Sequence, residues 1–310
     1  MAYETATVAG HYNLMAAINT FLTVTLPIAE RYTSLRADVG TADHEYIWQA
    51  PGLSETEQIF FGIKSYQSVA SDYYNIHVAT FTGYVPGNSF ETQPGIQRYA
   101  VPLWNNSIPY HLVANGQRVV CVALIENVDV SFYLGKMLPN ALPSQFPYPI
   151  VVSGMLPADS TERYSSVLSS FTFGFRGKHQ PTGSSWLGNL ALRDVNGTYI
   201  TPEIAPFNAL TSYNTPIYTL RNTATNQGEA SGDYGLEKLN ITTRSTASYS
   251  FPITNSSIIG NIYGILDGVY YVSGFNNATK NIITIDTVNY LVFRDGVKTG
   301  FRDYCALRLN

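Results

Sequence analysis

The side chains that most often carry catalysis or bind metals are few and widely spaced in this chain of 310 residues. None of its histidines forms an HxH or HxxxH pair, the short spacing that would bring ligands together around a metal. The only acidic–histidine cluster is Asp43-His44-Glu45, in a run of turn-forming residues typical of a solvated loop. The histidines therefore predict neither a catalytic nor a metal site; they are His11, His44, His77, His111 and His179.

Sequence motifs with a known chemical mechanism are also absent. The sequence contains no glycine-rich nucleotide-binding loop, no HExxH or CxxC pair and no GxSxG nucleophile motif. A glycosidase would need two carboxylates that face one groove. The candidates in the C-terminal part, two of them before glycine as in turns, are Asp267, Asp286, Asp295 and Asp303. We therefore expect no enzymatic activity and no cofactor.

Aromatic side chains offer a different chemistry, because their rings stack on sugars and fill subunit interfaces. The chain has 23 tyrosines, and its tryptophans are Trp48, Trp104 and Trp186, but no spacing among them marks a sugar-binding platform. Charged residues make up only 13% of the chain, about half the usual share. Since interfaces are depleted of Lys, Glu and Asp, this composition predicts a chain that buries much of its surface against neighbouring subunits.

Several classes of partner are disfavoured by charge and hydropathy. The net charge of −4, with Lys and Arg scattered singly, argues against binding to nucleic acid. The first ten residues lack the basic and apolar regions of a signal peptide, and no apolar run approaches the ~20 residues that span a bilayer. The two cysteines, Cys121 and Cys305, lie in apolar runs where buried free thiols are expected more than a disulfide. We therefore expect no nucleic-acid or membrane partner.

The first 44 residues contain the clearest helix pattern. Apolar residues recur at intervals of three and four from Leu14 to Leu22, which places them on one face of a helix over His11–Leu26. We interpret 1–44 as an N-terminal helical segment that begins with a short polar leader over Met1–Gly10. The apolar face of the helix should pack on the core of the protein.

From residue 45 onward the pattern is that of strands. Tyr73–Tyr84 alternates for nearly a dozen residues and makes His77 a packed strand residue. Asn115-Gly116 between apolar runs predicts a hairpin with a two-residue type I′ turn. Both faces of the strand after this turn are apolar, so it should be central in its sheet. One face carries Val119, Cys121 and Ala123, and the other carries Val120, Val122 and Leu124.

A proline-rich stretch over 139–149 interrupts the β-rich domain that we assign to 45–207. Because proline lacks a backbone N–H, four prolines within eleven residues are incompatible with a central strand. The stretch is either an extended arm that grips a neighbouring subunit or a crossover within the chain. The residues that would contact a neighbour are Phe146, Pro147, Tyr148 and Pro149.

The last third of the chain divides into a polar and an alternating part. Residues 208–244 are rich in Asn, Thr, Ser and Gly, which predicts a long exposed excursion. Residues 245–310 alternate, and Asp267-Gly268 and Asp295-Gly296 are turn dipeptides, so we predict an antiparallel meander packed on the preceding domain. The predicted fold is mainly β, an antiparallel β-sandwich or meander with a short N-terminal helical segment and long loops.

Several phrases of the sequence resemble those of virion structural proteins of tailed bacteriophages. From about Phe60 onward they are FFGIKSY, DYYNIHVATFTGYVPGNSFETQPG, IPYHLVANGQRVVCVALIENVDVSFYLG, LPSQFPYPIVVSG, NIYGILDGVYYVSGF and NYLVFRDGVKTGFRDYCALRL. The resemblance implies a non-enzymatic component of the particle, present in several copies around the tail axis. It implies copies of the chain and other virion proteins as partners, and it transfers no catalytic residue.

We therefore expect a structural protein of the phage tail region, in or next to the baseplate. A neck or head-associated structural protein is one alternative. Another is a tail tip protein that binds a receptor or host glycan through 208–244 and exposed aromatic side chains. The enzymatic alternative, a β-rich glycan depolymerase, would require two carboxylates at one groove.

Overall fold

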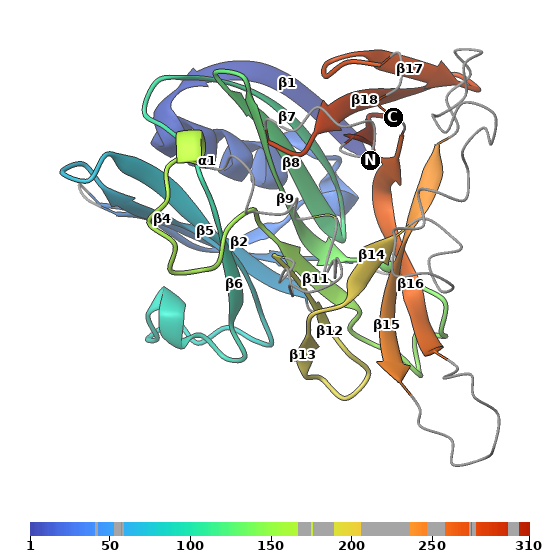
Figure 1. Cartoon of the computed structure of the whole chain (residues 1–310). Coiled ribbons are helices and arrows are strands. Elements are labelled where there is room, and N and C mark those ends of the chain that lie inside the picture. The colour runs from blue at the N-terminus through green and yellow to red at the C-terminus, as the bar shows by residue number, and fades with distance from the viewer. Residues whose placement is uncertain are drawn as a thin grey trace.

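The structure, a computed structural model, describes residues 1–40, 43–52, 57, 59–166, 175, 189–205, 236–246, 258–272, 274, 277–296 and 304–310. These residues form a mainly β fold of antiparallel sheets with one short helical segment, as the sequence predicts. Figure 1 shows three sheets, which we call the N-terminal, middle and C-terminal sheets.

The N-terminal sheet has five strands that follow one another in space in the order of the chain. This simple meander is expected where short turns connect antiparallel neighbours. Its strands are β2 (Thr33–Val39), β3 (His44–Ala50), β4 (Ile59–Ser68), β5 (Tyr73–Phe81) and β6 (Gln97–Val101).

The middle sheet joins the first strand of the chain to strands from its centre, in the order β1-β7-β8-β9-β11-β12-β13. Its long strands carry the apolar runs that the sequence places on both faces. The strands are β1 (Ala2–Ala9), β7 (Ser107–Asn115), β8 (Arg118–Ile125), β9 (Val128–Lys136), β11 (Ile150–Ser153), β12 (Leu190–Arg193) and β13 (Tyr199–Ile200).

The C-terminal sheet has the order β14-β15-β16-β19-β18-β17, with β10 also paired to β16. Its strands are β10 (Leu138–Pro139), β14 (Glu203–Ala205), β15 (Glu237–Thr246), β16 (Ile258–Tyr271), β17 (Ile282–Ile285), β18 (Val288–Arg294) and β19 (Tyr304–Arg308). The last strand lies between β16 and β18, so the predicted simple meander is wrong in its strand order. Residue alternation predicts strands but not which strand lies beside which.

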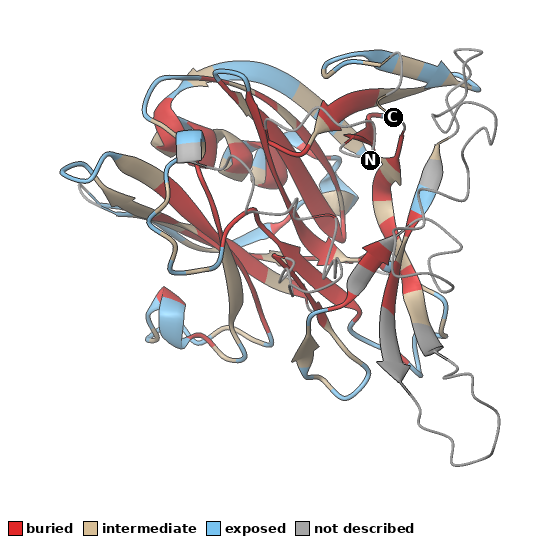
Figure 2. Cartoon of the chain, viewed as in Figure 1, coloured by how far each residue is buried: buried red, intermediate tan, exposed pale blue. Residues whose placement is uncertain are grey.

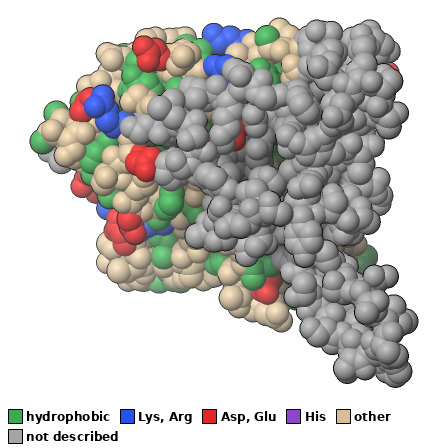
Figure 3. All heavy atoms as spheres, viewed as in Figure 1, with side chains coloured by type: hydrophobic (Ala, Val, Ile, Leu, Met, Phe, Trp, Pro, Cys, Tyr) green, Lys and Arg blue, Asp and Glu red, His purple; other side chains and the backbone are tan. Residues whose placement is uncertain are grey.

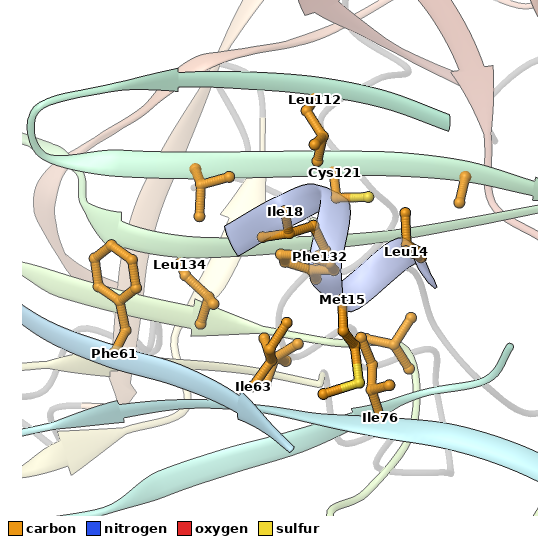
Figure 4. Packing of buried hydrophobic residues seen from close by; sticks show 14 of the residues in the cluster. Leu14, Met15, Ile18, Phe61, Ile63, Ile76, Leu112, Cys121, Phe132 and Leu134 are labelled. Atoms are coloured by element: carbon orange, nitrogen blue, oxygen red, sulfur yellow. The ribbon is translucent and has the colours of Figure 1, made fainter. Parts of the chain in front are cut away.

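The helix α1 (Gly10–Thr20) continues into a π turn over Phe21–Thr25. Its apolar face inserts Leu14, Met15 and Ile18 between the middle and N-terminal sheets (Figure 4). Short 3₁₀ turns complete the helical structure at Ile28–Glu30, Phe90–Thr92 and Tyr164–Ser166. The predicted helix over His11–Leu26 therefore corresponds to α1 and the turn that follows it.

Two large cores lie on the two faces of the middle sheet, and Figure 2 shows how much of that sheet is buried. In β8, Val119, Cys121 and Ala123 pack in the core shared with α1 and the N-terminal sheet. Val120 and Val122 pack in the core shared with the C-terminal sheet. The prediction of a central strand with two apolar faces is therefore confirmed for β8.

The start of the chain differs from the predicted helical segment with a polar leader. Residues 2–9 form β1, paired with β7 over its whole length, and residues 33–39 form β2. The sequence AYETATVA contains the β-branched residues Thr5, Thr7 and Val8, which favour a strand once β7 offers a partner. The assignment of 1–44 as a helical segment is thus corrected to two strands flanking a helix.

The predicted hairpin forms between β7 and β8, but its turn is displaced by one residue. Asn115 pairs with Arg118, so Gly116 and Gln117 are the loop residues. The Asn115 side-chain oxygen accepts hydrogen bonds from the backbone N–H groups of Gln117 and Arg118, at 3.0 and 3.1 Å. Asparagine therefore closes the turn with its side chain, and neither Asn115 nor Gly116 has the positive φ of a type I′ turn.

The predicted polar excursion over 208–244 is partly a strand. Residues 237–244 belong to β15, which pairs with β16, and the part over 208–235 lies outside the described residues. In β16, Asp267-Gly268 does not form the predicted turn, because the strand runs on to Tyr271. The turn of this region is instead Asp286-Thr287, both with positive φ, between β17 and β18.

Candidate interaction surface

The proline-rich stretch crosses from the C-terminal sheet to the middle sheet within one chain. It begins in β10, where Leu138 pairs with Ile265 of β16, and it ends at β11. The Asn140 N–H donates to the Tyr263 carbonyl at 2.9 Å, and the Met137 N–H donates to the Pro149 carbonyl at 3.0 Å. Of the two interpretations of the sequence, the crossover within the chain is therefore the one that the structure contains.

The four predicted contact residues of this crossover separate into two buried and two exposed ones. Phe146 is only 2% exposed and packs edge-on against the ring of Tyr263, and Pro149 is buried as well. The prediction that they contact a neighbour is corrected, because both fill the chain's own interior. Pro147 and Tyr148 are exposed, and the Arg193 guanidinium lies 5.3 Å from the Tyr148 ring centre.

Two histidines and two tyrosines form a cluster at one end of α1. The Tyr12 ring lies between His11 and His44, with ring centres 4.1 and 3.9 Å away, and the Tyr74 ring centre is 5.6 Å from that of His11. Gln67 donates a hydrogen bond to the Tyr12 hydroxyl. Burial lowers the pKa of His11 to about 4, and the Gln67 side chain offsets this only in part. We call these residues the aromatic cluster.

His77 lies on the opposite face of the N-terminal sheet and is packed in β5, as predicted. Its ring stacks on Tyr66 at 4.4 Å, and its Nε2 lies 2.6 Å from the Ala158 carbonyl oxygen. Since a carbonyl only accepts, Nε2 must carry the proton. Burial lowers the pKa of His77 to about 4, so the ring is neutral at pH 7. A neutral ring held by a carbonyl is a structural element of the sheet.

Three of the four carboxylates considered for glycoside hydrolysis lie in the described residues, and they occupy separate places in the fold. Asp267 pairs with Arg118, and Asp286 forms the β17–β18 turn. Asp295, the residue that follows β18, is buried. Asp303 lies outside the described residues. Within the part of the chain that the structure describes, no group of three or more His, Cys, Asp or Glu side chains could hold a metal ion.

The other aromatic and thiol residues singled out in the sequence make contacts within the chain where the structure describes them. Trp48 is buried and donates to Asn19 at 2.9 Å, Trp104 meets Tyr164 edge-on, and Trp186 lies outside the described residues. The two cysteines are both buried, and they pack in different cores. A disulfide between Cys121 and Cys305 is therefore not formed. No helix of the described residues is long and apolar enough to cross a bilayer.

Among the described residues, a surface without charged side chains lies at β1, α1 and the turns that follow α1. Residues 5–29 contain no Lys, Arg, Asp or Glu, although much of this stretch is exposed. The charges at its two ends are paired internally. Tyr110 donates to Glu4 at 2.7 Å, and the terminal ammonium of Met1 lies 3.2 Å from Glu30. The exposed residues, which we call the N-terminal surface, are Thr5, Ala6, Thr7, Ala9, Asn13, Ala16, Thr20, Val24, Thr25, Pro27, Ile28 and Ala29.

The N-terminal surface has the composition of a subunit interface, since interfaces lack charge and an exposed apolar side chain such as Ile28, 82% exposed, favours burial. The run of residues without charge is visible in the sequence. It does not stand out there as a surface, because the first ten residues are interpreted as a polar leader. Elsewhere charges are sparse as well, and Figure 3 shows them singly or in small groups.

No protein-family model matches the sequence, and no curated protein matches it.

Proposed function

We propose that the chain is a non-enzymatic structural component of a tailed-phage particle, located in or next to the tail baseplate and acting through multi-subunit interfaces. The observation that carries the proposal is the N-terminal surface, whose exposed side chains on β1, α1 and the following turns are all uncharged. A subunit that is assembled once and stays in place needs large interfaces of low charge. The resemblance of the sequence to tail-associated virion proteins supports the choice of a tailed-phage particle as the assembly.

Three sheets packed in layers suit such a role. The cores on both faces of the middle sheet bury its long strands and the apolar face of α1, and they leave the outer side of α1 and much of β1 exposed. Binding energy at an interface is lost when a surface must first be ordered. A rigid strand and helix present the N-terminal surface without that cost.

Mass spectrometry of purified particles, followed by immunogold labelling, tests the proposal. We expect the chain in several copies per particle, with label at the baseplate end of the tail. Label at the neck would favour the alternative of a neck or head-associated protein. Absence of the chain from particles purified from cells that express it would refute a structural role.

A pair of matched variants tests whether the N-terminal surface is the part that assembles. Ala16→Glu places a charge on the exposed face of α1 at a position where glutamate is a good helix former, so folding should be unaffected. Ser71→Glu places the same charge in the exposed β4–β5 turn. We expect Ala16→Glu to reduce incorporation into particles at least tenfold and Ser71→Glu to leave it unchanged. Equal incorporation of both would contradict the proposal.

A second candidate function, binding of a host glycan at the tail tip, is favoured by the aromatic cluster. Tyr12 and Tyr74 are partly exposed, and they lie beside polar groups of His44 and Gln67 that could bond to sugar hydroxyls. Calorimetric titration with host-surface polysaccharide tests it. Binding that Tyr74→Ala abolishes would favour the tail tip; no binding at millimolar sugar would exclude it.

A further inference from the structure

The outer edge of β1 presents unpaired backbone groups. β1 is the first strand of the middle sheet, and its register with β7 runs without a shift from Ala2 to Ala9. The Gly10 N–H donates to the Asn106 carbonyl at 2.7 Å, which continues the same ladder by one rung. Because hydrogen-bonded and non-bonded pairs alternate in an antiparallel ladder, the even-numbered residues of β1 bond to β7.

The backbone N–H and C=O groups of the odd-numbered residues Tyr3, Thr5 and Thr7 therefore point away from β7. Among the residues that the structure describes, no backbone group pairs with them on that side. Figure 2 shows this part of β1 as largely exposed. The edge is thus a row of alternating donors and acceptors open to a further strand.

The other edge strands of the described sheets are protected in ways that β1 is not. β13, β14, β17 and β6 are only 2, 3, 4 and 5 residues long. β2 has seven residues, but a register shift interrupts it and Arg36 and Asp38 charge it. β1 has eight residues without Pro, Gly or Lys, and its one charged side chain, Glu4, is bonded by Tyr110. Short strands, charges and bulges are the features that prevent edge pairing, and β1 has none of them except the carboxylate of Glu4, which is bonded by Tyr110.

We propose that β1 pairs antiparallel with β1 of a second copy of this chain about a two-fold axis, joining two middle sheets into one. Centred on Ala6, the pairing sets Thr5 of one copy opposite Thr7 of the other, and Tyr3 opposite Ala9. All outward groups of Tyr3, Thr5 and Thr7 are then bonded, and the threonine side chains pair across the strands. Glu4 faces Val8, so no like charges stand opposite each other.

A second copy fits this edge better than an unrelated strand for two reasons. The edge is complementary to itself under the two-fold operation, as an isologous dimer requires. The same operation keeps α1 of both copies on one face of the joined sheet, together with uncharged exposed residues such as Ala16 of α1 and Val24 of the following π turn. A two-stranded contact alone is marginal, and this neighbouring surface enlarges the area that is buried.

Proline substitutions test the hydrogen bonds at the outer edge of β1 separately from those that β1 makes to β7. Thr7→Pro removes an N–H that points away from β7, so the chain should fold and the dimer should lose a hydrogen bond per copy. Ala6→Pro removes an N–H that bonds to β7 and should instead destabilise the chain. Thr7→Val keeps the backbone and is the matched control. Sedimentation equilibrium of the full chain, purified with a C-terminal tag, measures the result.

We expect the wild type and Thr7→Val to show concentration-dependent dimers of twice the 34.2 kDa chain mass. Thr7→Pro should weaken dimerisation about tenfold or more. A wild type that stays monomeric at ~100 µM (a concentration at which even a weak edge contact is populated), or a Thr7→Pro protein that dimerises like the wild type, would overturn the proposal.

Hydrogen exchange of the wild type gives a readout that needs no variant. The amides of Thr5 and Thr7 should be protected in concentrated samples and exchange freely on dilution, whereas the amides of Glu4 and Ala6 stay protected in both. Exchange of Thr5 and Thr7 that does not depend on concentration would also contradict the pairing. This inference does not depend on the particle role: particles can contain a chain that is monomeric in solution, and a dimer can form without any particle.

Discussion

Arg118 of β8 and Asp267 of β16 tie the middle sheet to the C-terminal sheet, with 2.8 Å between the guanidinium Nε and the carboxylate Oδ2. The Arg118 side chain is 1% exposed, so its charge has almost no access to water. Asn115, the residue that closes the β7–β8 turn, also donates to Asp267 at 3.2 Å. One carboxylate therefore compensates a buried cation and fixes the hairpin end against the other sheet.

Removal of this carboxylate should be costly. Asp267→Ala leaves Arg118 buried without its counter-charge, and we expect the free energy of unfolding to fall by roughly 3 kcal/mol. The matched control is Asp159→Ala, which breaks the ion pair with Arg98, also 2.8 Å long but with an Asp159 side chain that is 80% exposed. It should cost less than ~1 kcal/mol. Urea unfolding measures both losses in free energy of unfolding. Equal losses would show that the burial of Arg118 does not determine the cost of removing its partner.

Gly268 provides the space for the same contact. Its φ is +74°, and a Cβ added there would lie 2.3 Å from Arg118 Nη2. Gly268→Ala combines backbone strain with a clash against a buried side chain, so we expect it to destabilise the chain by more than ~1 kcal/mol. In Gly83→Ala the added Cβ meets nothing within 4 Å, and the change in unfolding free energy should be within ~1 kcal/mol. If both variants unfold at the same urea concentration, the close approach of the Arg118 guanidinium to Gly268 does not contribute to stability.

The conformation at Asp267-Gly268 could not be predicted from the local sequence. The dipeptide is typical of a turn, and the structure does use the positive φ of Gly268, but inside a strand that continues. The deciding partner, Arg118, is 149 residues away along the chain. Local alternation sufficed for β8, whose two apolar faces are visible in eight residues. It could not place β19 between β16 and β18, because that order depends on contacts between distant segments.

The candidate surface was missed for a similar reason. A strand at the N-terminus needs a partner, and β7 begins about a hundred residues later, so AYETATVA looked like a polar leader. The sequence singles out Phe146 and Tyr148 because they lie between prolines. Whether each one points inward, as Phe146 does, or outward, as Tyr148 does, depends on the sheets at the two ends of the crossover.

Phe146 and Tyr148 should respond differently to truncation. Phe146→Ala empties a site in the core beside Tyr263, and we expect a loss of about 3 kcal/mol in the free energy of unfolding. Tyr148 is 42% exposed, so Tyr148→Ala should cost less than ~1 kcal/mol. Thermal unfolding of the two variants beside the wild type tests the pair. A large loss for Tyr148→Ala would mean that its stacking with Arg193 holds the crossover in place.

The stability of the protein should fall in mild acid because His11 and His77 are buried in neutral form. Burial lowers the pKa of each to about 4, whereas an unfolded chain binds the proton near pH 6.5. Between these values the unfolded state takes up protons that the folded state does not. The contribution of each neutral histidine to the free energy of unfolding is thus complete above about pH 6.5 and is lost as the pH falls toward 4. The free energy of unfolding should fall by up to ~1.4 kcal/mol per pH unit for each histidine.

Urea unfolding at pH 7.5, 6.0 and 5.0 measures that slope, and glutamine variants assign it. His77→Gln keeps a side-chain N–H for the Ala158 carbonyl but cannot titrate, and His11→Gln likewise removes one titrating ring. Each variant should therefore lose less stability than the wild type between pH 7.5 and 5.0, even where its stability at pH 7.5 is lower. A wild-type free energy of unfolding that does not change over this range would show that both rings reach solvent and take up protons in the folded state.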